Sequence, residues 1–206
     1  LGGTIHLLRA QDFPLPSAFE QAYQQSDLLV FETDIGQSQS ANFRSRMLKA
    51  STLPADQTLS DLLQPQTLKA LNRYLAEKQM NLQQLARFKP SMISITLTLL
   101  ELQKLGLGQS GVDSFYFQLA QRDGRQTLAL ETLQQQIDML AEMGSGQEDA
   151  MILQTLKENK NLSSLFSDMM KSWRTGDAGQ LQKLFIDPMK QDFPQIYQQL
   201  LVERNR

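Results

Sequence analysis

The sequence predicts an α/β fold in which a small, mostly parallel β-sheet is wrapped by many helices. Three apolar stretches of strand length support this prediction: Leu1–Leu8, Leu28–Thr33 and Gln126–Glu131. An amphipathic segment, Ala18–Gln25, separates the first two stretches, which gives the strand–helix–strand order typical of parallel neighbours. We therefore expect the first two strands to pair and to be buried under helices.

The rest of the chain is predicted to be helical. Apolar residues at helical spacing between 37 and 123 indicate a helix-rich insertion, with helices over Gln66–Lys78 and Met92–Leu105. From Leu133 to Arg206 the C-terminal half is almost entirely amphipathic helix, interrupted at glycines and prolines. We interpret residues 1–206 as a single domain that contains this insertion.

Composition excludes several classes of protein. Hydrophobic residues make up 41% of the chain and the formal net charge is -2, which fits a folded globular protein and argues against a nucleic-acid binder. The absence of cysteine excludes disulfides, thiolate metal sites and cysteine nucleophiles. No apolar run approaches the roughly 20 residues of a transmembrane helix, so no integral membrane segment is predicted.

The cellular compartment depends on what precedes the chain. The first residues already have the pattern of a strand, so we expect a segment to have been removed upstream of Leu1. A removed signal favours a periplasmic or secreted protein, and the alternative is a cytoplasmic one. The sequence does not define an oligomeric state.

The only histidine, His6, ends the motif Gly3-Thr4-Ile5-His6 within the first predicted strand. Ligands of open parallel sheets bind beyond the carboxyl ends of the strands. Imidazole at that place can ligate a metal ion or transfer a proton near neutral pH. The plainer interpretation is a half-buried histidine with one hydrogen bond, and the motif alone favours it.

Carboxylates end the other two predicted strands. Glu32 follows an apolar run, and burying an unpaired carboxylate costs several kcal/mol, so a metal, histidine or arginine partner is expected. Asp34 fits better as the cap of the next helix. Glu131 ends the third strand, and it also fits the start of the following helix. Together with His6, these strand-end groups predict one site.

A basic side chain near the C-terminus is a further candidate. Arg204 lies in the run Glu203-Arg204-Asn205-Arg206, where an arginine can balance acidic groups or stabilise a developing oxyanion. The plainer interpretation is an exposed charged tail.

The opening GGTIHLL and the following LPSAFEQAYQQSDLLVFETD resemble the signature of the TraB/GumN family, whose superfamily includes the Tiki metalloproteases. Further similarities follow in the family's order along the chain, at Lys89-Pro90, Gly111-Val112-Asp113, Leu130-Glu131-Thr132, Trp173 with Gly176-Asp177, and Arg204-Asn205.

The resemblance implies an EreA/ChaN-like α/β fold and a site made of two GxxH motifs and a strand-end glutamate. Carried over to this chain, it makes His6 and Glu32 metal ligands, with Glu32, Glu131 and Arg204 as catalytic residues. The implied cofactor is a divalent metal, Mn, Co or Zn. The second GxxH is expected after Arg204, yet the sequence has one histidine and stops at Arg206. We therefore expect the chain to be truncated before the second motif and to lack one metal ligand. In such a truncated chain the metal is expected to be absent as well.

Two functions follow from this resemblance. The first is a metal-dependent, peptidase-like hydrolase that acts on a peptide or small-molecule substrate. The second is a non-catalytic binding protein of the same superfamily, for a peptide such as a pheromone or for haem iron. The nine methionines stand mostly at helical spacing and indicate core packing more than a haem site. The sequence lacks the G-x-S-x-G motif of serine hydrolases, so it gives no support to that class. It also has no phosphate-binding loop motif and no dinucleotide-binding motif.

Overall fold

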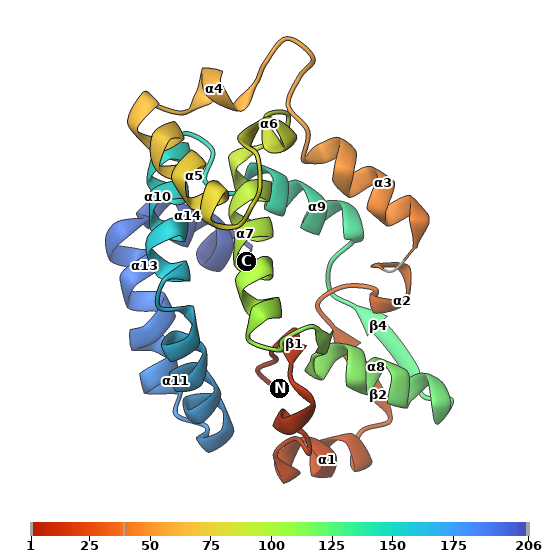
Figure 1. The fold of residues 1–206 in the computed structure, drawn as a ribbon. Coiled ribbons are helices and arrows are strands. Elements are labelled where there is room, and N and C mark those ends of the chain that lie inside the picture. The colour runs from red at the N-terminus through yellow and green to blue at the C-terminus, as the bar shows by residue number, and fades with distance from the viewer. Residues whose placement is uncertain (1, 39, 205–206) are drawn as a thin grey trace. The chain divides into compact units, whose positions relative to one another are not determined.

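The computed structural model describes residues 2–38 and 40–204, which form two compact units. The first unit combines Leu1–Leu48 with Leu102–Asp138, and the second combines Lys49–Glu101 with Met139–Arg206. The helix-rich α/β class predicted from the sequence is confirmed, with the β-structure confined to short strands (Figure 1).

The strands of the first unit form two small sheets. β1 (Leu7–Leu8) pairs antiparallel with β3 (Gln109–Ser110). β2 (Leu28–Phe31) pairs in parallel with β4 (Gln126–Ala129). The expected pairing of the first two strands is therefore wrong. The backbone before β1 is hydrogen-bonded elsewhere, because the carbonyl of Ile5 accepts from the amide of Val112 at 2.9 Å.

The helices of the first unit alternate with these strands. They are α1 (Ser17–Gln24), α2 (Ile35–Ser38), α3 (Ala41–Ala50), α8 (Val112–Arg122) and the start of α9 (Leu133–Glu142). α8 lies against β2 and β4 (Figure 1). The rings of Phe31 and Phe117 meet edge to face with centroids 6.0 Å apart. The chain passes from α8 through a turn at Gly124 into β4, so this helix covers one face of the parallel pair.

The other face of the parallel pair is exposed, although burial on both faces was expected. Its apolar side chains are Leu28, Val30, Leu128 and Leu130, which are between 40% and 74% exposed. Val30 stands opposite Leu128 in the register, so the two side chains lie on the same face of the sheet. Parallel sheets are usually covered on both faces, which makes this apolar face unusual.

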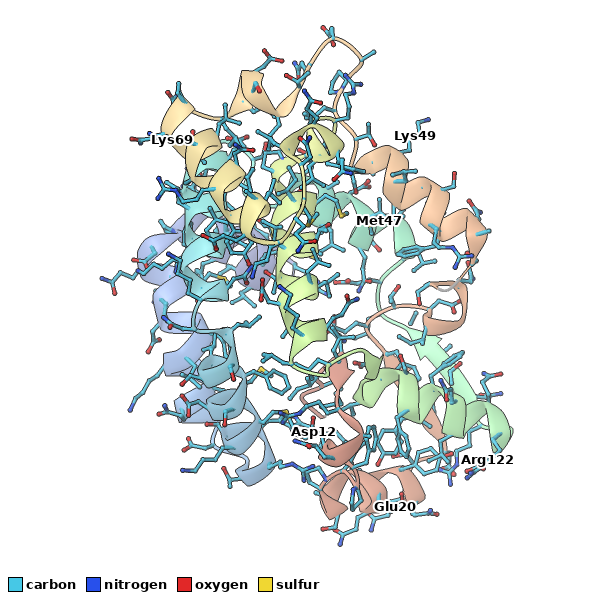
Figure 2. All side chains as sticks on the ribbon, in the orientation of Figure 1. Asp12, Glu20, Met47, Lys49, Lys69 and Arg122 are labelled. Carbon is cyan, nitrogen blue, oxygen red and sulfur yellow. The ribbon has the colours of Figure 1, made fainter. Side chains whose placement is uncertain are left out.

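Aromatic and charged side chains close the first unit around α1 and α8. Tyr23 packs against Tyr116, with ring centroids 5.4 Å apart, and its hydroxyl donates to Asp123 at 2.8 Å. Arg125 stacks its guanidinium over the Tyr23 ring at 4.1 Å. Arg122, labelled near the end of α8 in Figure 2, pairs with Asp123 at 3.0 Å. These contacts fix the far end of the helix whose first turn carries Asp113.

The second unit is helical throughout its described part, apart from one isolated bridge. Its helices are α4 (Leu59–Leu62), α5 (Pro65–Glu77), α6 (Leu82–Leu85), α7 (Pro90–Lys104), α10 (Glu148–Asn159), α11 (Leu162–Thr175), α12 (Ala178–Leu181), α13 (Asp187–Asp192) and α14 (Pro194–Tyr197). Two further segments, η2 (Gln182–Ile186) and η3 (Gln198–Glu203), are π-helical.

The core of the second unit is built by α4, α5, α6, α7 and α10 (Figure 1). Leu71, Leu75, Ile93 and Ile152 are fully buried in it and come from α5, α7 and α10. The predicted helices over residues 66–78 and 92–105 are thus confirmed. α7 is followed by Gly106 in a left-handed conformation, as expected of a helix stop.

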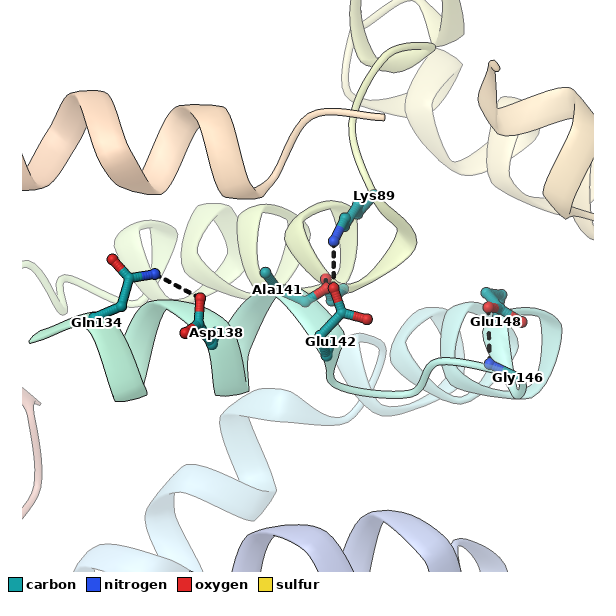
Figure 3. Close-up of polar contacts among 8 residues, drawn as sticks. Lys89, Gln134, Asp138, Ala141, Glu142, Gly146 and Glu148 are labelled. Carbon is teal, nitrogen blue, oxygen red and sulfur yellow. Dashed lines mark hydrogen bonds and ion pairs between the residues drawn. The ribbon is translucent and has the colours of Figure 1, made fainter. Parts of the chain in front are cut away.

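Polar contacts join α7 to the end of α9 within the second unit. Lys89, just before α7, pairs with Glu142 at 2.5 Å, and the hydroxyl of Ser91 donates to the carbonyl of Ala141 at 3.1 Å (Figure 3). Ser91 is buried, so its bond stabilises the packing of the two helices more than the exposed ion pair does.

Candidate functional site

His6 is placed by the contact between its own backbone and the start of α8. The amide of Val112 donates to the carbonyl of Ile5, and Leu7 pairs with Ser110 in the short antiparallel sheet. Gly111, the N-cap of α8, stands between these two contacts. A Cβ atom on Gly111 would lie 2.0 Å from the Ile5 carbonyl oxygen, a distance that no side chain allows. Only glycine therefore lets the GxxH backbone lie this close to the helix.

This approach brings His6 to the first turn of α8. Nδ1 of His6 lies 2.8 Å from Oδ2 of Asp113. The imidazole is 73% exposed, whereas the Asp113 side chain is only 10% exposed. The carboxylate thus sits beneath a ring that faces solvent, and we name the pair the His6–Asp113 dyad.

The surroundings of Asp113 favour its ionised form. Burial by itself raises the pKa of Asp113, but His6, through a hydrogen bond and charge, opposes it. The hydroxyl of Thr4 and the backbone of Asp113 add hydrogen bonds, and the resulting pKa is below the ordinary value of 3.8. Near neutral pH the Asp113 carboxylate is therefore an acceptor only, so Nδ1 of His6 must donate to it.

The dyad determines what the imidazole can do. With a proton on Nδ1, a neutral ring carries its lone pair on Nε2. A carboxylate behind a histidine is the usual support of both a general base and a metal ligand, because it fixes the tautomer and raises basicity. The chemistry of this site is thus assigned to Nε2 of an exposed imidazole.

Glu32 and Glu131 come together at the end of the parallel sheet. Each follows its strand, β2 and β4, and the amide of Glu131 donates to the carbonyl of Glu32 at 2.8 Å. Glu32 is exposed and Glu131 half-buried. The expectation that Glu32 is buried is therefore wrong, because the apolar run before it has one face open to solvent.

A buried hydroxyl follows Glu32 at the same end of the sheet. Thr33 is 7% exposed, and within the described part of the chain its hydroxyl makes no hydrogen bond. A buried hydroxyl without a hydrogen-bond partner carries a cost in folding free energy.

Two of the plainer interpretations are confirmed at the following helices. Asp34 accepts from the amide of Gln37 at 3.0 Å and so caps α2. Thr132 and Gln135 exchange hydrogen bonds at the start of α9. Glu131 therefore stands immediately before the cap of α9, where its charge favours the helix N-terminus.

Arg204 belongs to the second unit and directly follows η3. It is half-buried. Its expected role in balancing acidic groups or stabilising an oxyanion stays a prediction. Asn205 and Arg206, which complete the Arg-Asn similarity, lie outside the described residues.

The described side chains fit only part of a metal site. His6 with Asp113 behind it has the form of one metal ligand. Across residues 2–38 and 40–204, however, no three histidine, cysteine, aspartate or glutamate side chains gather closely enough to hold a metal ion. A catalytic zinc site usually has three protein ligands, so the described set is incomplete.

Asp113 is the partner of His6 that reasoning from the sequence missed. It appeared there only within the similarity Gly111-Val112-Asp113. The usable signal was a glycine followed two residues later by an acid at the start of a predicted helix, because such an acid faces the helix N-terminus. No local signal indicates that Asp113 contacts His6, which lies 107 residues earlier in the chain.

Comparison with known proteins places the chain in a family. The model of the TraB/PrgY/gumN family matches residues 1–206. No curated protein and no solved structure matches the chain significantly. Among the helices of the described stretches, none has the length and apolarity needed to cross a membrane. Because the family match extends over all 206 residues, the chain belongs to the TraB/PrgY/gumN family.

Proposed function

We propose that the chain is a hydrolase of the peptidase type whose site is centred on His6. The observation that supports this most directly is the His6–Asp113 dyad, with its 2.8 Å contact beneath an imidazole that is 73% exposed. An oriented and accessible imidazole is suited to proton transfer at neutral pH.

In the proposed reaction, Nε2 of His6 accepts a proton from a water molecule as the water oxygen attacks the carbonyl carbon of the substrate. Asp113 stabilises the imidazolium that forms. The imidazolium then returns the proton to the leaving amine as the C–N bond breaks, which gives a carboxylic acid and an amine. General-base assistance of this kind contributes about 10²–10⁴-fold to the rate.

The other predicted residues have supporting roles in this proposal. Arg204 belongs to the second unit, and its role as the group that stabilises the developing oxyanion is carried over from the family resemblance alone. Glu32 and Glu131 supply negative charge at the end of the parallel sheet. If a divalent ion, Mn, Co or Zn, bound Nε2 of His6 with Glu32 as a second ligand, it would supply Lewis-acid chemistry in place of the base role of His6, because the single lone pair of Nε2 cannot serve both. Because the described ligand set is incomplete, no step is assigned to such an ion.

The test is hydrolysis of a library of fluorogenic peptides by the purified chain, with and without added Mn, Co or Zn. His6→Ala is expected to reduce turnover to background, and Asp113→Asn to reduce it by about 10²-fold or more. Glu20→Gln, at an exposed position on α1 (labelled in Figure 2), is the matched control and is expected to retain activity.

Unchanged turnover in a folded His6→Ala variant would contradict the proposal. Complete inactivity of the wild type under every metal condition, with peptide or haem binding retained, would instead support the non-catalytic binding role.

A further inference from the structure

The second unit contains a cavity of about 220 Å³ that the site at His6 does not use. It lies among α10, α11, α13, α14 and η2. Met151, Thr155 and Ile196 are its buried residues, each at most 9% exposed. The hydroxyl of Thr155 is already bonded to the carbonyl of Met151 at 2.9 Å, so this part of the cavity presents an apolar surface.

A π-helical segment forms one wall of the cavity. Leu184 and Phe185 are consecutive residues of η2, and both line the cavity. In an ordinary α-helix, consecutive side chains point about 100° apart. A π-helical turn is wider, and such turns occur frequently at functional sites. Both of these bulky apolar side chains border the same space.

The charged residues that line the cavity are both acidic. Glu158 comes from α10 and Asp192 from the end of α13, and both are exposed. Glu158 Oε1 accepts a hydrogen bond from Gln154 Nε2 at 2.7 Å, which orients this carboxylate. Lysine, arginine and histidine are absent from the described lining. A cation is therefore the ligand whose charge complements Glu158 and Asp192.

Size and charge together define the occupant. An apolar cavity of about 150 Å³ holds a benzene molecule, so 220 Å³ accommodates a ring or a branched alkyl group with a short linker. We propose that this cavity binds a small organic cation, with an aromatic or branched aliphatic body in the apolar part and an ammonium group between Glu158 and Asp192. This inference does not depend on the hydrolytic role of His6.

The test uses phenylethylammonium as the probe, with neutral 2-phenylethanol and anionic 3-phenylpropionate as matched compounds. Binding is followed in the full chain by NMR of ¹³C-labelled methionine methyl groups. Met151 and Met189 line the cavity, whereas Met47 on α3 does not. Saturable shifts of the Met151 and Met189 signals are expected with phenylethylammonium, while the Met47 signal stays in place.

Charge selectivity provides the second readout. Phenylethylammonium is expected to bind more tightly than the neutral alcohol, and the anion more weakly than either. Glu158→Gln and Asp192→Asn each reduce the preference for the cation about threefold to fivefold, the effect of an exposed ion pair. Asp168→Asn, at an exposed position of α11 outside the cavity, leaves the preference unchanged.

Two results would overturn the inference. One is the absence of any shift at Met151 and Met189 at millimolar phenylethylammonium in the folded protein. The other is binding at these methyl groups with equal affinity for all three compounds, or with a cation preference that survives both neutralising substitutions.

Discussion

At the scale of single residues, the dyad couples ionisation to folding. Asp113 is buried, yet its pKa lies below the ordinary value because His6, Thr4 and the helix backbone stabilise the carboxylate. Because the pKa of Asp113 is lower in the folded state than in the unfolded state, the ionised carboxylate stabilises the fold. This stabilisation is fully present above the unfolded pKa of about 4, and it is lost as the pH falls through the folded pKa.

This linkage predicts a pH dependence for Asp113→Asn. The free energy of unfolding of the wild type is expected to fall below about pH 4 more steeply than that of the variant, because asparagine has no proton to gain. Urea denaturation between pH 2 and 7 measures the difference, with Asp168→Asn as an exposed control. Parallel curves for wild type and Asp113→Asn would show that Asp113 is not stabilised as a carboxylate.

A second buried group titrates at the other end of the pH scale. Burial and the hydrogen bond donated to Glu101 at 2.7 Å raise the pKa of Tyr74 to about 12. Ultraviolet titration is expected to show one of the four tyrosines ionising near pH 12, and Tyr74→Phe to remove that step. The stabilisation by Tyr74 is lost as pH rises from about 10 towards 12. If the substitution instead removes a step near pH 10, the phenol is not buried as described.

At the scale of the elements, the junction of the GxxH segment with α8 depends on Gly111. Gly111→Ala forces Cβ against the backbone at Ile5 and His6, which cannot yield as a side chain tip does. We expect a loss of about 2–3 kcal/mol in urea denaturation. Gly108→Ala is the matched control, because nothing lies within 4 Å of a Cβ atom there. Equal stability of the two variants would contradict the close approach that positions His6.

The exposed face of the parallel pair gives another prediction at this scale. Val30 is 50% exposed and Leu128 58% exposed, so Val30→Thr and Leu128→Thr remove little buried apolar surface. Each is expected to change the free energy of unfolding by less than about 0.5 kcal/mol, whereas Phe31→Ala, on the covered face, costs about 3 kcal/mol. Losses above about 1.5 kcal/mol for the threonine variants would show that this face is buried in solution.

At the scale of the whole molecule, the sequence predicts local structure better than contacts between distant segments. The helices over 66–78 and 92–105 and the cap at Asp34 depend on neighbouring residues, and all are confirmed. The pairing of β2 with β4 joins segments about 98 residues apart along the chain. Nothing in a short window of sequence encodes that choice, so the prediction that β2 pairs with β1 failed.

The same distinction applies to the candidate site. His6 was chosen from the motif that contains it, because a glycine-led strand segment with the only histidine is a local signal. Asp113 lies 107 residues away, and only the fold brings the two together. Glu32 followed an apolar run that suggested burial, but the run belongs to a sheet with one face open to solvent.

The central claim is that Asp113 holds the proton of His6 on Nδ1 and leaves the chemistry to Nε2. Because His6 is the only histidine, its two ring nitrogens give unambiguous signals in a long-range ¹H–¹⁵N NMR spectrum of the full chain. In spectra recorded at a pH where the ring carries one proton, we predict that this proton is on Nδ1 in the wild type and shifts towards Nε2 in Asp113→Asn. A ring that is protonated at Nε2 in the wild type, and unchanged in the variant, would contradict the account.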